Sequence, residues 1–259
     1  MRLLTYFALA AAVACTLAAP TGAQTYGGAS SSDLLGYRSS AGHYYNRSLG
    51  SKVRSNATRR RTRPQTPPQR PSGGKPTTAG TPTRPASSTR PAPGATTFNP
   101  VAPSVAPQQL AAKVTAERKE TEQFYAGLLE SYREMLRERG LPENDVARAA
   151  SFAVSVSYSV YSDGRFLSEQ QLAGLREQMR EVFSEDAEFQ RLSDRDKQEL
   201  YESYAIIGMY LSSIYDGARK AGHQKGVEQM RHLARTQLEE TFGASAEQLA
   251  FTEDGVKYK

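Results

Sequence analysis

The sequence has no tryptophan and a single cysteine, Cys15, which lies in an apolar stretch near the N-terminus. A chain that loses this stretch has no thiol, which excludes disulfides, cysteine-ligated metals and a cysteine nucleophile. Histidine is also scarce, with three in 259 residues. His223 and His232 are nine residues apart, so on one helix they would face opposite sides and would not share a metal.

Motifs that carry chemistry are absent as well. The sequence has no glycine-rich phosphate loop, no G-x-S-x-G and no H-E-x-x-H. Asp194 and Asp196 resemble the start of a calcium loop, but Glu199 stands at the glycine position and Ala205 at the final glutamate position. We therefore predict no catalytic, cofactor-binding or metal-binding site, and no cofactor.

Charge is unevenly distributed along the chain, which has a net charge of +6. Residues 24–107 contain 12 Lys and Arg against one acid, whereas residues 108–259 contain 20 Lys and Arg against 26 Asp and Glu. The high isoelectric point therefore belongs to a basic N-terminal arm, and the remainder is acidic. We predict three segments: a signal peptide (1–23), the arm (24–107) and a folded domain (108–259).

The N-terminus has the pattern of a secretory signal. Arg2 precedes an Ala/Leu-rich run up to Ala19, and Thr21-Gly22-Ala23 follows. This predicts cleavage between Ala23 and Gln24 and an exported protein, periplasmic or extracellular. Two alternatives stay open: an uncleaved anchor, for which the run is shorter than the ~20 apolar residues of a spanning helix, and a lipoprotein acylated at Cys15.

The arm has 12 of the 14 prolines and few apolar residues. Such a composition does not offset the entropy of ordering the backbone, so we predict a disordered tether. Its densest positive charge is at Arg59, Arg60, Arg61 and Arg63. These four are our candidates for contact with a polyanion, either an anionic lipid surface or an envelope polymer. A plain solvated spacer is the simpler alternative.

The acidic segment has the 3.6-residue periodicity of helices. We predict an all-α, bundle-like domain of about five helices, over residues 108–139, 143–161, 168–183, 193–221 and 224–242. In the second, Val and Tyr alternate with Ser at residues 152–160, which is also a strand period. Because no partner strand is evident, we favour a buried helix.

Local signals mark several boundaries in this domain. Ser168 with Gln171 has the spacing of a capping box, and Ser193 has that of an N-cap. Gly208 lies in the middle of a helix, which a close helix crossing would explain. Asp254-Gly255 predicts a turn in the C-terminal tail.

The segment from Phe152 to Gly243, with its tail, resembles an uncharacterised family of exported bacterial proteins known only as a domain of unknown function. The likeness rests on a Tyr/Val-rich helix ending in Tyr161, on Gln170-x-x-x-x-Leu175-Arg176-x-Gln178, on Gln198-x-x-x-Glu202, and on Phe242-Gly243 with Leu249-x-Phe251-Thr252-x-x-Gly255. The resemblance implies a helical exported domain and no activity. Gln198 and Glu202 either brace neighbouring helices or line a site.

The leading functional hypothesis is a non-enzymatic exported protein whose helical domain binds an unknown protein partner or itself and is held by the basic arm. A second hypothesis is a cell-wall hydrolase using carboxylates in a cleft between helices. If the signal peptide prediction is wrong, the Arg- and Tyr-containing arm is typical of nucleic-acid binding. The arm is also a candidate to mask the acidic domain of its own chain.

Overall fold

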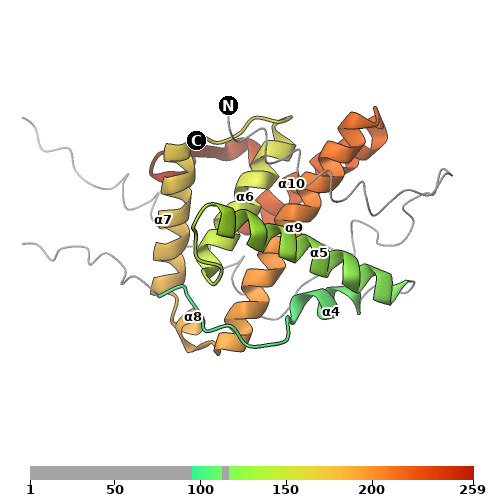
Figure 1. Ribbon diagram of the computed structural model, residues 1–259. Helices are drawn as coiled ribbons and strands as arrows, with labels where there is room; N and C mark the ends of the chain where they lie inside the picture. The colour runs from blue at the N-terminus through green and yellow to red at the C-terminus, as the bar shows by residue number, and fades with distance from the viewer. Residues whose placement is uncertain (1–94, 113–116) are drawn as a thin grey trace, which may run out of the picture.

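The structure is a computed structural model and describes residues 95–112 and 117–259. The described chain is mostly helical, which confirms the predicted all-α class (Figure 1). Its α-helices, in chain order, are α4 (Ala106–Ala111), α5 (Arg118–Glu138), α6 (Val146–Tyr161), α7 (Glu169–Glu185), α8 (Ala187–Arg191), α9 (Asp194–Lys220) and α10 (Gln224–Phe242).

The ambiguous Val/Ser segment is helical, as predicted, and forms the central helix α6. It packs against α7, α9 and α10, so its apolar and small side chains are buried on nearly every side. The Ser157 hydroxyl donates to the Ala153 carbonyl at 2.8 Å, so its burial leaves no unmet donor. Asp145 starts the helix by accepting from the backbone N–H of Ala147 at 3.1 Å.

The apolar core lies on both sides of the crossing between α6 and α9. The larger cluster contains the fully buried side chains of Tyr132, Tyr201 and Phe242, and a smaller one lies between α6, α9 and α10. At the crossing, a Cβ on Gly208 would lie 2.5 Å from the Phe152 ring and 3.3 Å from the Cα of Ala153. This confirms the close helix approach predicted for Gly208.

The prediction of one helix over residues 108–139 is wrong. Two helices, α4 and α5, occupy this region, and they pack against each other and against α9 (Figure 1). The start of α4 is set by Pro107 in its first turn. Separating the two helices lets Leu110 of α4 and Tyr125 of α5 both enter the core.

Residues 95–105, which we call the strap, pack on the helices, although the predicted arm extends to Pro107. The strap runs beside the start of α6: the Val146 N–H donates to the Thr96 carbonyl at 3.0 Å, and the Phe98 N–H to the Asn144 carbonyl at 3.2 Å. The Phe98 side chain is 4% exposed and its ring centroid lies 5.4 Å from that of Tyr201. These partners are distant in sequence, so local composition does not reveal the docking.

The remaining helices follow their predicted signals. Ser168 and Gln171 form both hydrogen bonds of a capping box at the start of α7, and Ser193 caps α9 with Asp196. Gly243 ends α10 in the left-handed conformation, with φ 64°. One short helix, α8, lies between the predicted helices 168–183 and 193–221, where no helix is predicted.

The C-terminal tail forms a β-hairpin, which adds strands to the all-α prediction. Strands β1 (Leu249–Thr252) and β2 (Gly255–Tyr258) are antiparallel around the predicted Asp254-Gly255 turn. The hairpin packs on α7, where the Gln178 side-chain amide donates to the Val256 carbonyl at 3.0 Å and accepts from the Val256 N–H at 2.8 Å. The Gln178 amide thereby makes the two backbone hydrogen bonds that a third strand would otherwise make with Val256, which helps to stabilise a hairpin of only two short strands.

Candidate functional site

Glu202 is the most completely buried charged side chain of the described residues and lies in the N-terminal half of α9. Its Oε2 accepts from the backbone N–H groups of Val105 at 2.7 Å and Ala106 at 3.0 Å. Its Oε1 accepts from Gln198 Nε2 at 2.9 Å and from Arg133 Nη2 at 3.2 Å. Glu202 therefore binds the end of the strap, the first turn of α4, and a side chain of α5.

Gln198 extends this contact along the strap. It lies one helical turn before Glu202, so both side chains project from the same face of α9. Its Oε1 accepts from the Val101 N–H at 2.6 Å. We call Arg133, Gln198 and Glu202 the latch, because together they hold Val101, Val105 and Ala106.

The geometry of the latch favours bracing over catalysis. Four donors already occupy the two oxygens of Glu202, and the side chain has no exposed surface. A general base needs a lone pair within reach of a substrate proton. A buried carboxylate that is paired with arginine and satisfied by backbone N–H groups instead joins three chain segments.

Two tyrosines border the latch. The rings of Tyr132 on α5 and Tyr201 on α9 lie 5.9 Å apart between centroids, and both side chains are fully buried. Burial raises the pKa of Tyr132 and of Tyr201, and the Arg133 charge partly opposes the shift at Tyr201. Both residues therefore stay protonated and neutral in the physiological range.

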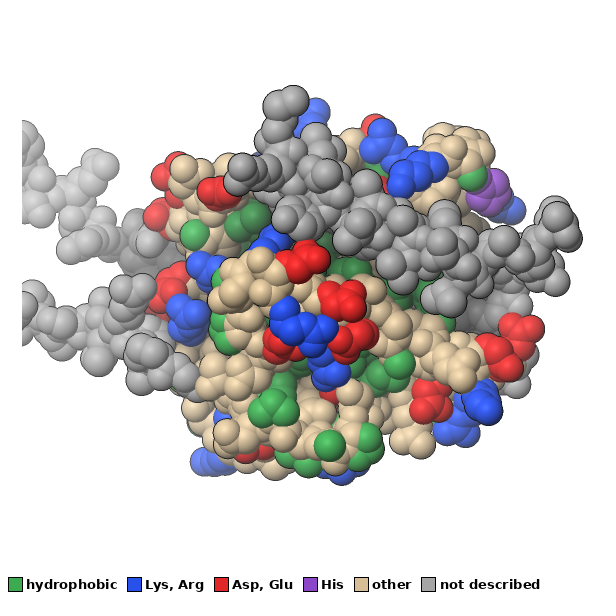
Figure 2. All heavy atoms as spheres, in the orientation of Figure 1, with side chains coloured by type: hydrophobic (Ala, Val, Ile, Leu, Met, Phe, Trp, Pro, Cys, Tyr) green, Lys and Arg blue, Asp and Glu red, His purple; other side chains and the backbone are tan. Residues whose placement is uncertain are grey.

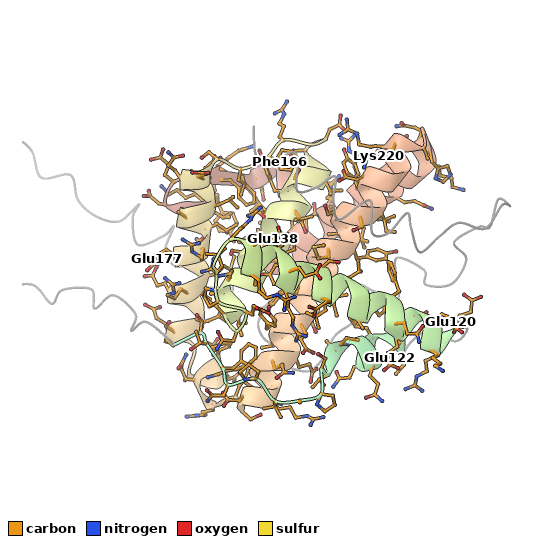
Figure 3. The ribbon with its side chains drawn as sticks, viewed as in Figure 1. Glu120, Glu122, Glu138, Phe166, Glu177 and Lys220 are labelled. Carbon is orange, nitrogen blue, oxygen red and sulfur yellow. The ribbon has the colours of Figure 1, made fainter. Side chains whose placement is uncertain are left out.

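The acidic side chains labelled in Figure 3 are spread over α5 and α7. Glu120 and Glu122 lie at one end of α5, Glu138 at the other, and Glu177 on the outside of α7 (Figure 3). Acidic and basic side chains also intermingle on the face shown in Figure 2. On α5, for example, Arg137 pairs with Glu130 and with Glu143.

The predicted site residues separate into two groups. Gln198 and Glu202 are brought together with the strap. The cleavage residues Ala23 and Gln24, and the arm residues Arg59, Arg60, Arg61 and Arg63, lie outside the described residues.

The two histidines of the domain lie on the surface. His223 precedes α10 and His232 lies on it, and both are exposed. Within residues 95–112 and 117–259, no three His, Cys, Asp or Glu side chains are grouped as metal ligands would be. Over the same ranges, no helix combines the length and the apolar character needed to cross a membrane.

The sequence does not reveal Arg133 or the strap as parts of the latch. Arg133 is one of several charged residues on α5, and neither its type nor its spacing distinguishes it. Asp145 carries a weak signal, because an aspartate directly before an apolar run is typical of an N-cap. Its Oδ1 also accepts from the Thr96 hydroxyl at 2.7 Å, so the same residue holds the strap at its other end.

Comparison with known proteins returns one family. A family model described as "Family of unknown function (DUF6683)" matches residues 4–259. The match includes the apolar N-terminus and the arm as well as the helices. No curated protein and no solved structure matches the chain.

Proposed function

Since the chain belongs to DUF6683, a family of unknown function whose model covers residues 4–259, we propose its role from its own architecture. We propose that it is an exported, non-enzymatic binding or structural protein in which a basic arm is firmly joined to a helical domain. The observation that carries this proposal is the strap, which connects arm and domain and is anchored at both ends.

The two anchors of the strap are buried and independent. At its start, Thr96 is bound to Asp145 and Val146 at the beginning of α6. At its end, Val105 is bound to Glu202 on α9. A linker that only separates two parts needs no buried anchor, because polar loops are satisfied by water. Anchoring to two core helices suits a connection that holds the domain in place.

The arginine cluster of the arm suggests the kind of surface to which the arm binds. Arg59, Arg60, Arg61 and Arg63 are not balanced by nearby acids, and a cluster of arginines is attracted to anionic lipid headgroups. In this proposal the arm binds an anionic lipid surface, and the helical domain, held near that surface, binds the partner or has the structural role.

Replacing these four arginines with serine should weaken binding of the mature chain to vesicles containing anionic lipid. Each arginine near such a surface contributes about 1 kcal/mol, so we expect a loss of roughly two to three orders of magnitude in the partition constant. Cosedimentation at low and at physiological salt measures it, and binding by the unsubstituted chain should weaken as salt rises.

The matched control removes the same charge elsewhere in the arm, by replacing Arg38, Arg47, Arg84 and Arg90 with serine. This control should lose distinctly less binding, because the dense cluster remains. Equal losses would show that only total charge matters, and no loss in either variant would contradict the arm contact. Tighter binding to single-stranded RNA than to vesicles would favour the nucleic-acid interpretation instead.

Export is tested separately by the N-terminus of the mature protein. If residues 1–23 are a signal peptide, mass spectrometry of the protein from its native host should find Gln24 as the first residue. A chain beginning at an acylated Cys15 would indicate a lipoprotein. Full-length protein with its initiator methionine in the cytosol would contradict the proposal.

A further inference from the structure

Three arginines lie where α6 packs against α7. Arg148 lies in the first turns of α6, and Arg176 and Arg180 lie one turn apart on one face of α7. All three side chains are only partly exposed. Arg180 Nη2 lies 3.7 Å from the carboxylate of Asp145, the N-cap of α6, which places this face of α7 beside the first turn of α6. Burial and the charge of Arg176 lower the pKa of Arg148, and the charge of Asp145 partly opposes this shift.

Two polar groups in this region have no hydrogen-bond partner among the described residues. They are the Nε–H of Arg148 and the hydroxyl of Tyr132, and both atoms are buried. The charge of Arg148 also lowers the pKa of Tyr132, which opposes the larger rise caused by burial. Buried donors without an acceptor are rare in folded proteins and destabilise them.

The acids nearby are already committed to other partners. Asp145 accepts from the Thr96 hydroxyl and the Ala147 N–H through Oδ1, and its Oδ2 lies 3.7 Å from Arg180 Nη2. Glu177 also pairs with Arg180, at 2.8 Å. Arg148 and Arg176 form no ion pair with any carboxylate of the described residues, so the cluster has donors in excess of acceptors.

We propose that this arginine cluster binds a phosphate group, with Arg148 and Arg176 as the direct ligands. A guanidinium presents parallel N–H donors that match two phosphate oxygens, which makes arginine well suited to this anion. Arg180 remains paired with Asp145 and Glu177, and its charge adds to the positive potential at the phosphate. The bound group is a phosphate monoester or inorganic phosphate, or the same group on a lipid.

The test uses the mature chain carrying the four serine substitutions in the arm, so that the densest arginine cluster of the arm does not bind the added anion. Inorganic phosphate is titrated at constant ionic strength while the unfolding midpoint is recorded. We expect a saturable rise in the midpoint, because a ligand that binds only the folded state stabilises it. The Arg148→Gln and Arg176→Gln variants should each bind phosphate about tenfold or more weakly.

Arg195→Gln is the matched control, because it removes the same charge from an exposed position on α9. The NMR signal of the Arg148 Nε–H gives a readout independent of folding, and it should shift with phosphate in the control but not in Arg176→Gln. The absence of a saturable effect, or equal affinities in all three variants, would overturn the proposal. Vesicles containing phosphatidate, in phosphate-free buffer, distinguish a lipid-borne group from a soluble one.

Because the dense arginine cluster of the arm is removed in this experiment, its outcome does not depend on the contact proposed for that cluster. Without phosphate, Arg148→Gln should be at least as stable as the unsubstituted protein, since it removes a repelled cation. A purely structural arginine would instead lower stability when replaced and leave the phosphate response unchanged.

Discussion

Replacing Glu202 with alanine is expected to lower the free energy of unfolding by about 3–5 kcal/mol, the usual cost of removing one partner from a buried ion pair. The change leaves the N–H groups of Val105 and Ala106 without an acceptor. It also leaves Arg133 without its buried partner, although Arg133 is partly exposed and regains some hydration. The expected effect is large for a single substitution because the Glu202 side chain joins three segments of the chain: the strap, α4 and α5.

Urea denaturation measures the loss of stability, and hydrogen exchange locates it. We expect the amides of Val105 and Ala106 to exchange much faster in the variant, while those in the middle of α6 follow global stability. Glu240→Ala on α10 is the control, since this exposed glutamate should change stability by no more than about 0.5 kcal/mol. A loss below about 1 kcal/mol for Glu202→Ala would mean that the latch does not hold the strap.

Replacing Gly174 with alanine is expected to displace the C-terminal hairpin from α7. A Cβ at this position would overlap the Glu253 carbonyl oxygen and lie 2.8 Å from the Gly255 nitrogen. Both are backbone atoms, so no side chain can rotate to make room. Overpacking of this kind costs about 1–3 kcal/mol, and the gain in helix propensity, up to about 1 kcal/mol, offsets only part of it.

Replacing Gly127 with alanine should have the opposite effect on stability. Gly127 lies within α5, and a Cβ there would meet nothing within 4 Å. Gly127→Ala should therefore stabilise the protein by about 0.5–1 kcal/mol. Thermal unfolding of both variants gives the signs, and the side-chain amide signals of Gln178 report whether the hairpin has left α7. Equal effects of the two substitutions would contradict the close contact at Gly174.

The residues that carry the family resemblance have structural roles in this fold. Gln178 binds the backbone of Val256, and Tyr258 in the hairpin donates its hydroxyl to the Phe242 carbonyl at 2.8 Å. The Phe251 ring packs 4.4 Å from that of Tyr158. Gln178 and Val256, which are 78 residues apart in sequence, thus join α7 to the tail. Several of the residues behind the resemblance thus dock the tail on the helices.

Most helix boundaries could be predicted because their causes are local. A capping serine satisfies the N–H groups of its own first turn, and a glycine ends a helix through its own backbone conformation. Ser168, Ser193 and Gly243 act in this way. The close crossing at Gly208 was also predictable, because a mid-helix glycine is unfavourable unless a neighbour requires the space.

The strap, the hairpin and the separation of α4 from α5 could not be predicted in the same way. Each depends on a partner far along the chain: Phe98 on Tyr201, Val105 on Glu202, and Val256 on Gln178. A short segment such as 95–105 has too few apolar residues to order itself, and only contacts formed by the folded helices offset its loss of entropy.

Amino-acid order alone was enough for the helical class, the capping residues and the opposite charges of arm and domain, because these follow from periodicity, from hydrogen bonds within one turn and from composition. The partners of Glu202, and the meeting of Arg148 with Arg176 and Arg180, emerged only once the helices were packed. Burial and pairing are properties of side chains that come together from separate helices, and no local pattern encodes which of them will meet.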